Sequence, residues 1–233
     1  MSAGVDVRAD RVGVQHVTAA GVIRALDDVT LEVPGGTSLA VVGPSGCGKS
    51  TLLGLLGGLA LPTTGTVRVG TEVISSLSDQ DRATFRRRNV GFVWQDDNLL
   101  PFLTIEENLA LQSALATHDR ADGSDVPQLL ARLGLDHDAD RLPDQLSGGQ
   151  RQRGAIARAI AHAPSLLLAD EPTGSLDSRN AAAAIDLLLE AGERLGATVI
   201  VVTHDPAVAG RMDQVVGLRD GTVTTSPAGR HGR

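Results

Sequence analysis

Residues 43–50 have the composition and spacing of a loop that binds phosphate groups. The stretch reads GPSGCGKS and matches the pattern G-x-x-x-x-G-K-S/T without a mismatch. Its glycines let the backbone curl so that successive N–H groups point at an anion, and a helix that begins there adds partial positive charge. Lys49 is expected to reach the β- and γ-phosphates of a nucleotide, and the Ser50 hydroxyl to bind Mg²⁺. The predicted phosphate-binding residues are Gly43, Pro44, Ser45, Gly46, Cys47, Gly48, Lys49, Ser50 and Thr51.

Two carboxylates follow a second apolar segment. Leu166–Ala169 has the composition of a buried strand, and Asp170 and Glu171 follow it directly. The carboxyl ends of parallel strands are where open α/β sheets bind ligands. Asp170 is therefore the candidate Mg²⁺ ligand and Glu171 the candidate general base for an attacking water. The alternative is a pair of solvated acids at the start of a loop, which a nearby phosphate-binding loop makes less attractive.

The elements around these residues predict an α/β fold. Apolar runs at 38–42, 66–69, 90–93, 165–169 and 198–202 indicate strands, with a helix at 49–58. Alternating or clustered apolar residues at 5–7 and 27–33 indicate an N-terminal antiparallel β subdomain. Helical patterns fill 96–163: a capping box at Thr104 and Glu107, a helix at 126–133 and another from Gln150. An Asp220-Gly221 hairpin turn closes the pattern.

We therefore expect one domain over 1–233, a P-loop NTPase fold whose parallel-sheet core covers about 1–95 and 164–224. A helical subdomain is inserted at about 96–163, and 225–233 is expected to be a flexible tail. The whole of this division follows from where the apolar periodicity changes from strand-like to helical and back.

Composition excludes several classes of protein. A net charge of −7 and 2% aromatic residues argue against nucleic-acid binding. The longest apolar run, 52–61, is about half the length of a membrane span, and 1–10 lacks the apolar core of a signal peptide. A single cysteine excludes an internal disulfide and fits a reducing cytosol. The one basic run, 86–88, is interpreted as a solvated helix end.

The stretch Leu146–Gln150, LSGGQ, narrows the choice among phosphate-loop proteins, which include kinases, GTPases and helicases. It resembles the signature of ABC ATPases. Ser147, Gly148, Gly149 and Gln150 open a helix and so form a second anion site. The resemblance implies that this site binds the γ-phosphate of ATP held by another subunit, in a head-to-tail dimer. The alternative is a glycine-rich helix cap without function.

The resemblance extends over roughly 5–223 and implies roles for three more residues. Gln95 resembles the glutamine that senses Mg²⁺ and water, and 172–177 resembles the loop that ends at Asp177 and contacts the opposite subunit. His204 resembles the switch histidine at the γ-phosphate. Taken alone, His204 would be an ordinary strand-end histidine.

Two positions differ from the family pattern, and a third carries a separate expectation. His16 stands where an adenine-stacking aromatic is usual; it is either that stacking residue or a solvent-facing histidine in a turn. Gly154 lies inside the signature helix, where a bulkier residue is usual. Cys47 is expected to react with thiol reagents because Lys49 and a helix N-terminus favour its thiolate, or else to be an inert small residue.

Finer motifs are similar to one branch of the family, the lipoprotein-releasing, macrolide-efflux and cell-division ATPases. They include GFVWQ at 91–95 and NLLP at 98–101. This resemblance implies an ATPase that uses ATP and Mg²⁺, forms a homodimer and energises a separate permease, so that the chain is cytoplasmic and peripheral to the inner face of the membrane. Trp94 and the apolar run at 99–103 either pack inward, joining the helical subdomain to the core, or mark where the permease docks. The resemblance implies that Leu100 and Phe102 face outward.

Two alternatives remain open. One is a soluble ABC ATPase of DNA repair or the ribosome, although the long insertions or second ATPase half of those proteins are not present. The other is a scaffold that binds ATP, turns it over slowly and signals through its permease. The cargo, the direction of transport and the identity of the permease do not follow from these residues.

Overall fold

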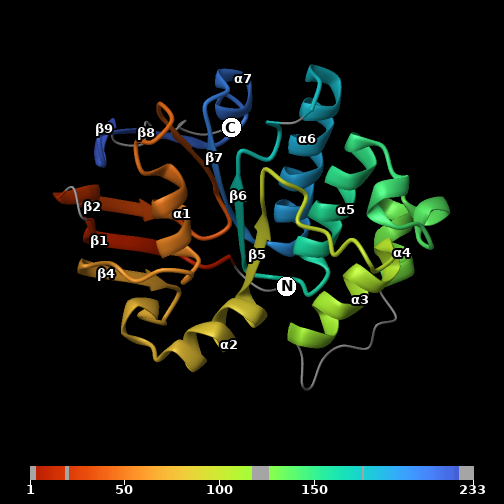
Figure 1. Ribbon diagram of the computed structural model, residues 1–233, viewed down its shortest axis with the longest axis horizontal. Helices are drawn as coiled ribbons and strands as arrows, with labels where there is room; N and C mark the ends of the chain where they lie inside the picture. The colour runs from red at the N-terminus through yellow and green to blue at the C-terminus, as the bar shows by residue number, and fades with distance from the viewer. Residues whose placement is uncertain (1–3, 19–20, 117–125, 175, 226–233) are drawn as a thin grey trace.

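A six-stranded sheet in the order β5-β6-β7-β3-β8-β9 lies at the centre of the computed structural model, which describes residues 4–18, 21–116, 126–174 and 176–225 (Figure 1). Its first five strands are parallel, and β9 pairs antiparallel with β8 through the Asp220-Gly221 turn. Helices cover both faces, so the central strands are mostly apolar. The strands are β3 (Ser38–Val42), β5 (Val90–Val93), β6 (Leu166–Asp170), β7 (Thr198–Thr203), β8 (Gln214–Arg219) and β9 (Thr222–Thr225).

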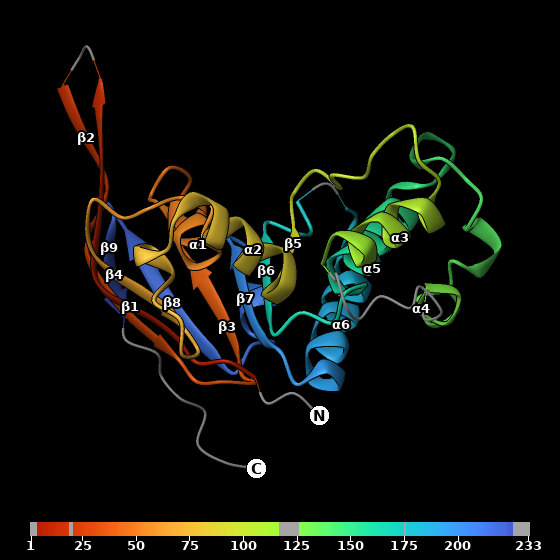
Figure 2. The ribbon, with the colours of Figure 1, turned by 90° about the horizontal axis from the view of Figure 1, so that it is seen from below.

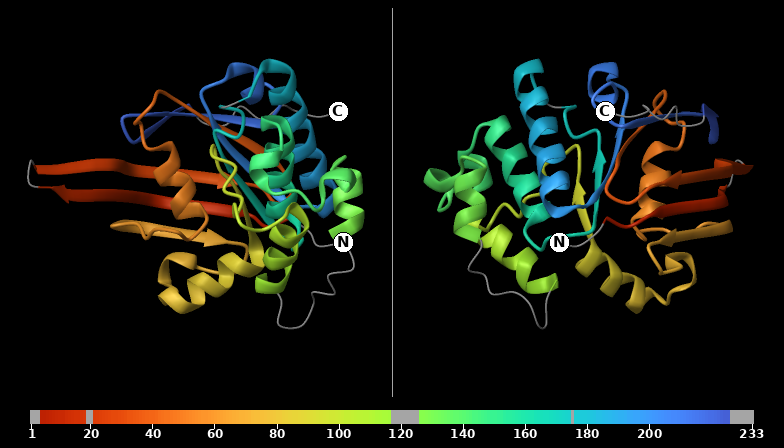
Figure 3. Two further views of the ribbon diagram at one scale, coloured as in Figure 1. Left: turned by 45° about the vertical axis from the view of Figure 1, so that its right-hand side comes forward. Right: turned by 180° about the vertical axis from the view of Figure 1, so that it is seen from behind.

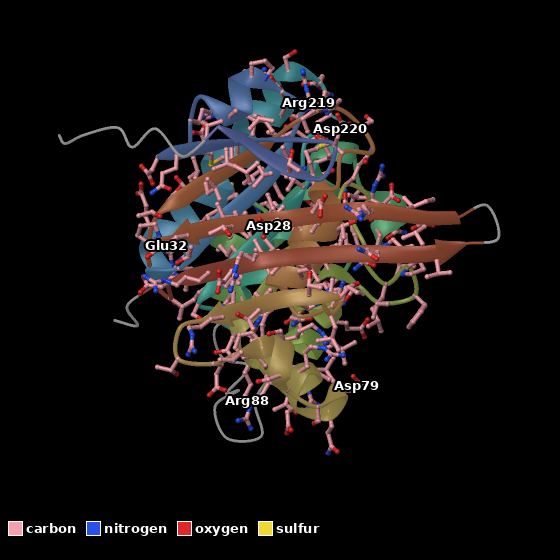
Figure 4. All side chains as sticks on the ribbon, turned by 90° about the vertical axis from the view of Figure 1, so that its left-hand side faces the viewer. Asp28, Glu32, Asp79, Arg88, Arg219 and Asp220 are labelled. Carbon is pink, nitrogen blue, oxygen red and sulfur yellow. The ribbon has the colours of Figure 1, made fainter. Side chains whose placement is uncertain are left out.

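A second, antiparallel sheet has the order β2-β1-β4, formed by β1 (Val7–Thr18), β2 (Gly21–Val33) and β4 (Thr64–Val69). Its outer face is polar and carries both signs of charge, with Asp28 and Glu32 on β2 (Figure 4). β1 and β2 are much longer than the strands expected at 5–7 and 27–33, and they extend beyond the body as a hairpin (Figure 2). Bulges interrupt their register and polar residues lie on both faces near the tip, so the strand alternation was too weak to detect.

Seven helices are found in the described part of the chain. α1 follows β3, α2 packs near the antiparallel sheet, and α3 to α6 lie on the other side (Figure 3). They are α1 (Lys49–Leu56), α2 (Asp79–Asn89), α3 (Ile105–Ala116), α4 (Val126–Arg132), α5 (Gly148–Ile160), α6 (Ser178–Leu195) and α7 (Pro206–Ala209), with short 3₁₀ turns at Ile74–Ser76, Asp136–Asp138 and Pro143–Gln145. None of these described helices is long and apolar enough to cross a membrane.

The apolar side chains form two clusters, one on each side of the central sheet. One joins α1 and the antiparallel sheet to β3 and β6, and the other joins α3 to α6 to the opposite face. The predicted local signals are confirmed: Thr104 and Glu107 exchange their capping-box hydrogen bonds, and Gly134 ends α4 with a φ of 62°. Helix α1 ends at Leu56, earlier than expected. The boundaries of a helical subdomain at about 96 and 163 stay a prediction.

His162 lies two residues after the end of α5 and is expected to make the fold sensitive to acid. Burial lowers the pKa of this histidine to about 4, and the backbone of Val90 offsets the shift only in part. The unfolded chain then takes up the proton first, so stability is complete above about pH 6.5 and is lost as pH falls towards 4. The loss should reach about 3 kcal/mol at most.

The measurement is the free energy of unfolding of His162→Phe against pH. As pH falls from 6.5 to 4, the free energy of unfolding of the wild type should fall relative to that of the variant. His137→Phe is the matched control, since the His137 side chain is almost fully exposed. Parallel curves for wild type and His162→Phe would contradict the prediction.

Candidate functional site

The phosphate loop lies between β3 and α1, as the sequence predicts. Gly46 and Gly48 have φ angles of 78° and 104°, a region that favours glycine. A Cβ at Gly48 would lie 2.4 Å from the carbonyl oxygen of Ala25 on β2, so no larger residue fits there. The loop and the adjoining strand thus require glycine for both conformation and space.

Lys49 is only 8% exposed and is already held by the loop. Its Nζ donates hydrogen bonds to the carbonyl oxygens of Gly43 at 2.9 Å and Pro44 at 3.1 Å. An ammonium group has three donors, so one remains for a ligand. The charge is therefore positioned before any phosphate arrives.

Glu171 connects the phosphate loop to the end of β7. Its Oε1 lies 3.9 Å from Lys49 Nζ, and its Oε2 lies 2.9 Å from His204 Nδ1. Parallel pairing of β6 with β7 brings these strand ends together. Glu171 also has a φ of 45°, which costs conformational energy in a residue with a long side chain. Such strain is typical of positions where a side chain must point in one direction.

Asp170 and Ser50 form the neighbouring oxygen pair. Burial raises the pKa of the Asp170 carboxyl above its usual value, and the charge of Glu171 raises it further. A hydrogen bond from the Ser50 hydroxyl and the charge of Lys49 act in the opposite direction. A carboxylate and a hydroxyl side by side are hard oxygen donors of the kind that Mg²⁺ prefers.

A cleft of about 640 Å³ brings together predicted residues from the phosphate loop, the acidic strand end and the segment after β5. The Gln95 side chain enters it from the segment after β5 and packs against Gly174, where a Cβ would lie 3.3 Å from Gln95 Nε2. His204 joins the group through Glu171. The cleft is lined by Ser45, Gly46, Lys49, Ser50, Trp94, Gln95, Asp96, Asn98, Asp170 and Glu171.

The signature residues do not line this cleft. Ser147 caps α5: its hydroxyl accepts from Gln150 N at 3.3 Å, and Gln150 Oε1 accepts from Ser147 N at 2.9 Å. Gly149 lies close to Asn180 at the start of α6, where a Cβ would meet Asn180 Oδ1 at 2.9 Å. The N-termini of α1 and α5, the two predicted anion sites, therefore lie in separate places in one chain.

Asp177 and His16 also lie outside the cleft. Asp177 caps α6, and hydrogen bonds from Asn180 hold the pKa of its carboxyl below the usual range. Its neighbour Ser175 lies outside the described residues. His16 is exposed on the hairpin opposite Ile23, two residues along β2 from the Ala25 carbonyl that touches the phosphate loop. That separation is about 7 Å along the strand.

Cys47 is buried, with 5% of its surface exposed, and its side chain packs in the core. The expectation of a reactive thiol therefore loses its basis, because reactivity requires access to the sulfur. Any contribution of Cys47 to phosphate binding must come from its backbone.

Several residues that shape the site were not predicted. Asn108, fully buried on α3, accepts from Leu100 N and donates to the carbonyl oxygens of Leu100, Leu103 and Thr104. Asp138, also buried, accepts from Gln150 Nε2 at 2.7 Å. For Asn108 the usable local signal was an asparagine four residues after a capping threonine. Nothing in the sequence marks Asp138.

Comparisons with known proteins show the family to which this chain belongs. A family model described as ABC transporter matches residues 26–174. The chain is 44% identical over 208 residues to the lipoprotein-releasing system ATP-binding protein LolD of Shewanella denitrificans, with 89% of each chain covered. It is 41% identical over 216 residues to the protein of the same name from Xanthomonas campestris pv. campestris strain 8004, covering 92% of this chain and 90% of the relative.

A solved structure is similar over almost the whole fold. The dimeric ATP-binding cassette MJ0796, in a post-hydrolysis state bound to ADP and Pi, aligns with a TM-score of 0.88 and 37% identity, covering 97% of this chain and 100% of that one. Both the sequence relatives and this structure extend across the phosphate loop, the acidic strand end and the signature segment. The chain belongs to the ABC transporter family, as an ATP-hydrolysing ATP-binding subunit.

Proposed function

We propose that this ATPase energises a separate membrane permease in an export or mechanical-signalling system. The observation that carries the proposal is an apolar side chain exposed at the surface, in the segment that follows the cleft residue Asn98. Phe102 is 73% exposed, in the loop that follows Gln95. The names of the LolD relatives point to a system that releases lipoproteins, and the proposal extends that class to this chain.

The loop that carries Phe102 is anchored to helix α3. Buried Asn108 makes four hydrogen bonds to the backbone of residues 100–104. Leu99 is buried and Leu100 half-buried, so the apolar run divides into anchored residues and the outward-facing Phe102. A rigidly displayed aromatic residue is typical of the centre of an interface. A permease segment seated there would move when Gln95 responds to a nucleotide.

The catalytic assignments belong to the same proposal. Glu171 would accept the proton of the attacking water at its carboxylate, with His204 holding that carboxylate in place. Lys49 and the N–H groups of the phosphate loop would bind the phosphates of ATP. Ser50, Asp170 and Gln95 would hold Mg²⁺, which offsets phosphate charge when bound. Their oxygen atoms and the Ser50–Asp170 hydrogen bond support this choice of metal.

A head-to-tail homodimer would complete each ATP site. Its support is the separation of Ser147–Gln150 from the cleft, together with the dimeric state of the similar cassette MJ0796. Ser147, Gly148 and Gly149 would then face the γ-phosphate of the partner's ATP, with Asp177 at the subunit boundary. His16 would stack on adenine, since the hairpin rises beside the phosphate loop (Figure 2). In such a system the subunit lies on the cytoplasmic side, attached through its permease.

The test replaces Phe102 by aspartate in the tagged chain, recovered from detergent-solubilised membranes of its own cells. We expect the folded subunit to keep its basal ATPase, while the amount of copurified permease and the permease-stimulated ATPase fall. Loss of a central aromatic contact costs about 2 kcal/mol or more, or about 30-fold in affinity. Leu115→Asp is the matched control, an exposed leucine on α3. A complex that survives Phe102→Asp with full coupled activity would place the docking site elsewhere.

A further inference from the structure

Three contacts join the segment after Gln95 to helix α5. Arg151 Nε donates to Asp97 Oδ2 at 2.9 Å, and Arg158 Nη1 donates to the carbonyl oxygen of Asn98 at 2.5 Å. Between them the Leu99 side chain packs over Gly154, where a Cβ would lie 3.4 Å from Leu99 Cδ1. We call these contacts, between residues 97–99 and Arg151, Gly154 and Arg158, the loop clamp.

The spacing on α5 shows that the loop clamp uses one face of the helix. Positions 151, 154 and 158 are three and four residues apart, so they lie above one another on successive turns. Gly154 costs helix stability of about 1 kcal/mol relative to alanine. Its lack of a side chain lets Leu99 and Ile105 approach the helix closely, which gives a structural reason for this departure from the family pattern.

The loop clamp ends at the signature segment. Besides its bond to Asp97, the Arg151 guanidinium donates through Nη1 to the carbonyl oxygen of Leu146 at 2.7 Å. Leu146 immediately precedes Ser147, the cap of α5. A single planar group with fixed donors therefore connects the loop beside the nucleotide cleft to the start of the anion-binding helix. On the other side, Asn98 itself lines the cleft next to Gln95.

The two ends of the loop clamp would serve different nucleotides. In the proposed head-to-tail dimer, on which this inference rests, Gln95 contacts the subunit's own ATP and Ser147 contacts the partner's. We propose that Asp97, Arg151 and Arg158 are positioning residues that make the signature end of a subunit move with its Gln95 loop, so that ATP in one site organises the other. The loop clamp thereby supplies cooperativity between the two sites.

The test compares Asp97→Asn and Arg151→Met with the doubly exchanged Asp97→Arg/Arg151→Asp protein. Wild type is expected to hydrolyse ATP with a Hill coefficient above one. Each single variant should lower the Hill coefficient to one and reduce kcat about fivefold or more. Binding of ATP to the dilute monomer should stay unchanged. The exchanged pair restores the ion pair between positions 97 and 151 but not the bond from position 151 to the Leu146 carbonyl. It should therefore recover thermal stability without cooperativity, whereas a merely structural role of the ion pair would recover both.

Arg211→Met is the matched control, because Arg211 forms an ion pair with Asp186 on α6, away from the Gln95 loop. Thermal unfolding of each variant shows that it is folded. Suppose that the wild-type protein dimerises with ATP but both single variants keep its Hill coefficient. That result would overturn the proposed role of the loop clamp without contradicting the composite ATP sites. A wild-type chain that stays monomeric with ATP would instead overturn the head-to-tail dimer, and the loop clamp with it.

Discussion

Glu171→Gln should keep ATP binding and lose ATP turnover by about 10²- to 10⁴-fold, the usual effect of removing a general base. The amide has the size of the carboxylate and can accept a hydrogen bond from His204, but it cannot take a proton from water. The backbone at 171 is already held at a φ of 45°, and the wild-type side chain is fixed between Lys49 and His204. The substitution therefore removes the chemistry and retains the shape of the site.

The same variant should accumulate an ATP-bound dimer, visible as a doubling of mass by light scattering after size exclusion. Glu193→Gln, the same change at an exposed position on α6, is the matched control and should turn over normally. Turnover by Glu171→Gln at the wild-type rate would show that another group activates the water.

Lys49→Met should weaken ATP binding by about 10- to 100-fold. A hydrogen bond to a charged group contributes about 1.5–3 kcal/mol, and the Lys49 ammonium is the group positioned to make one with phosphate. Methionine preserves the buried aliphatic length but removes the donors to Gly43 and Pro44, so the loop should also lose order. Isothermal titration with ATP measures the affinity, and ADP provides the comparison without a γ-phosphate.

Arg132→Met is the control for loss of one positive charge, since Arg132 is exposed at the end of α4. If ATP affinity falls equally in both variants, the effect is one of net charge rather than of the phosphate loop. An unchanged affinity for Lys49→Met would remove Lys49 from the binding site.

Local chemistry is what made much of this molecule predictable. The phosphate loop, β5, the capping box of α3 and the Asp220-Gly221 turn each depend on residues within a few positions of one another, and each was found where expected. The same is true of Asp170 and Glu171, because a buried strand delivers whatever follows it to one edge of the sheet.

Contacts between distant segments could not be predicted in this way. The His204–Glu171 hydrogen bond spans 33 residues and the Arg151–Asp97 ion pair spans 54, and no periodicity relates such positions. The length of β1 and β2 depends on cross-strand pairing rather than on either strand alone. The burial of Cys47 likewise depends on the packing of other elements over the loop.

The two carbonyl bonds that hold Lys49 have a practical consequence, because Lys49 is the only lysine among the 233 residues. All the other Lys and Arg residues are arginines, whose guanidinium groups do not react with amine-directed reagents. Reductive methylation with ¹³C-formaldehyde would keep the charge and label Lys49 Nζ once local opening of the loop exposes it, as well as the α-amino group. The Lys49 resonance would follow the exchange of backbone carbonyls for phosphate oxygens as nucleotide is added. The phosphate loop thus contains the one side-chain amine of the protein, which can serve as a spectroscopic probe without any mutation.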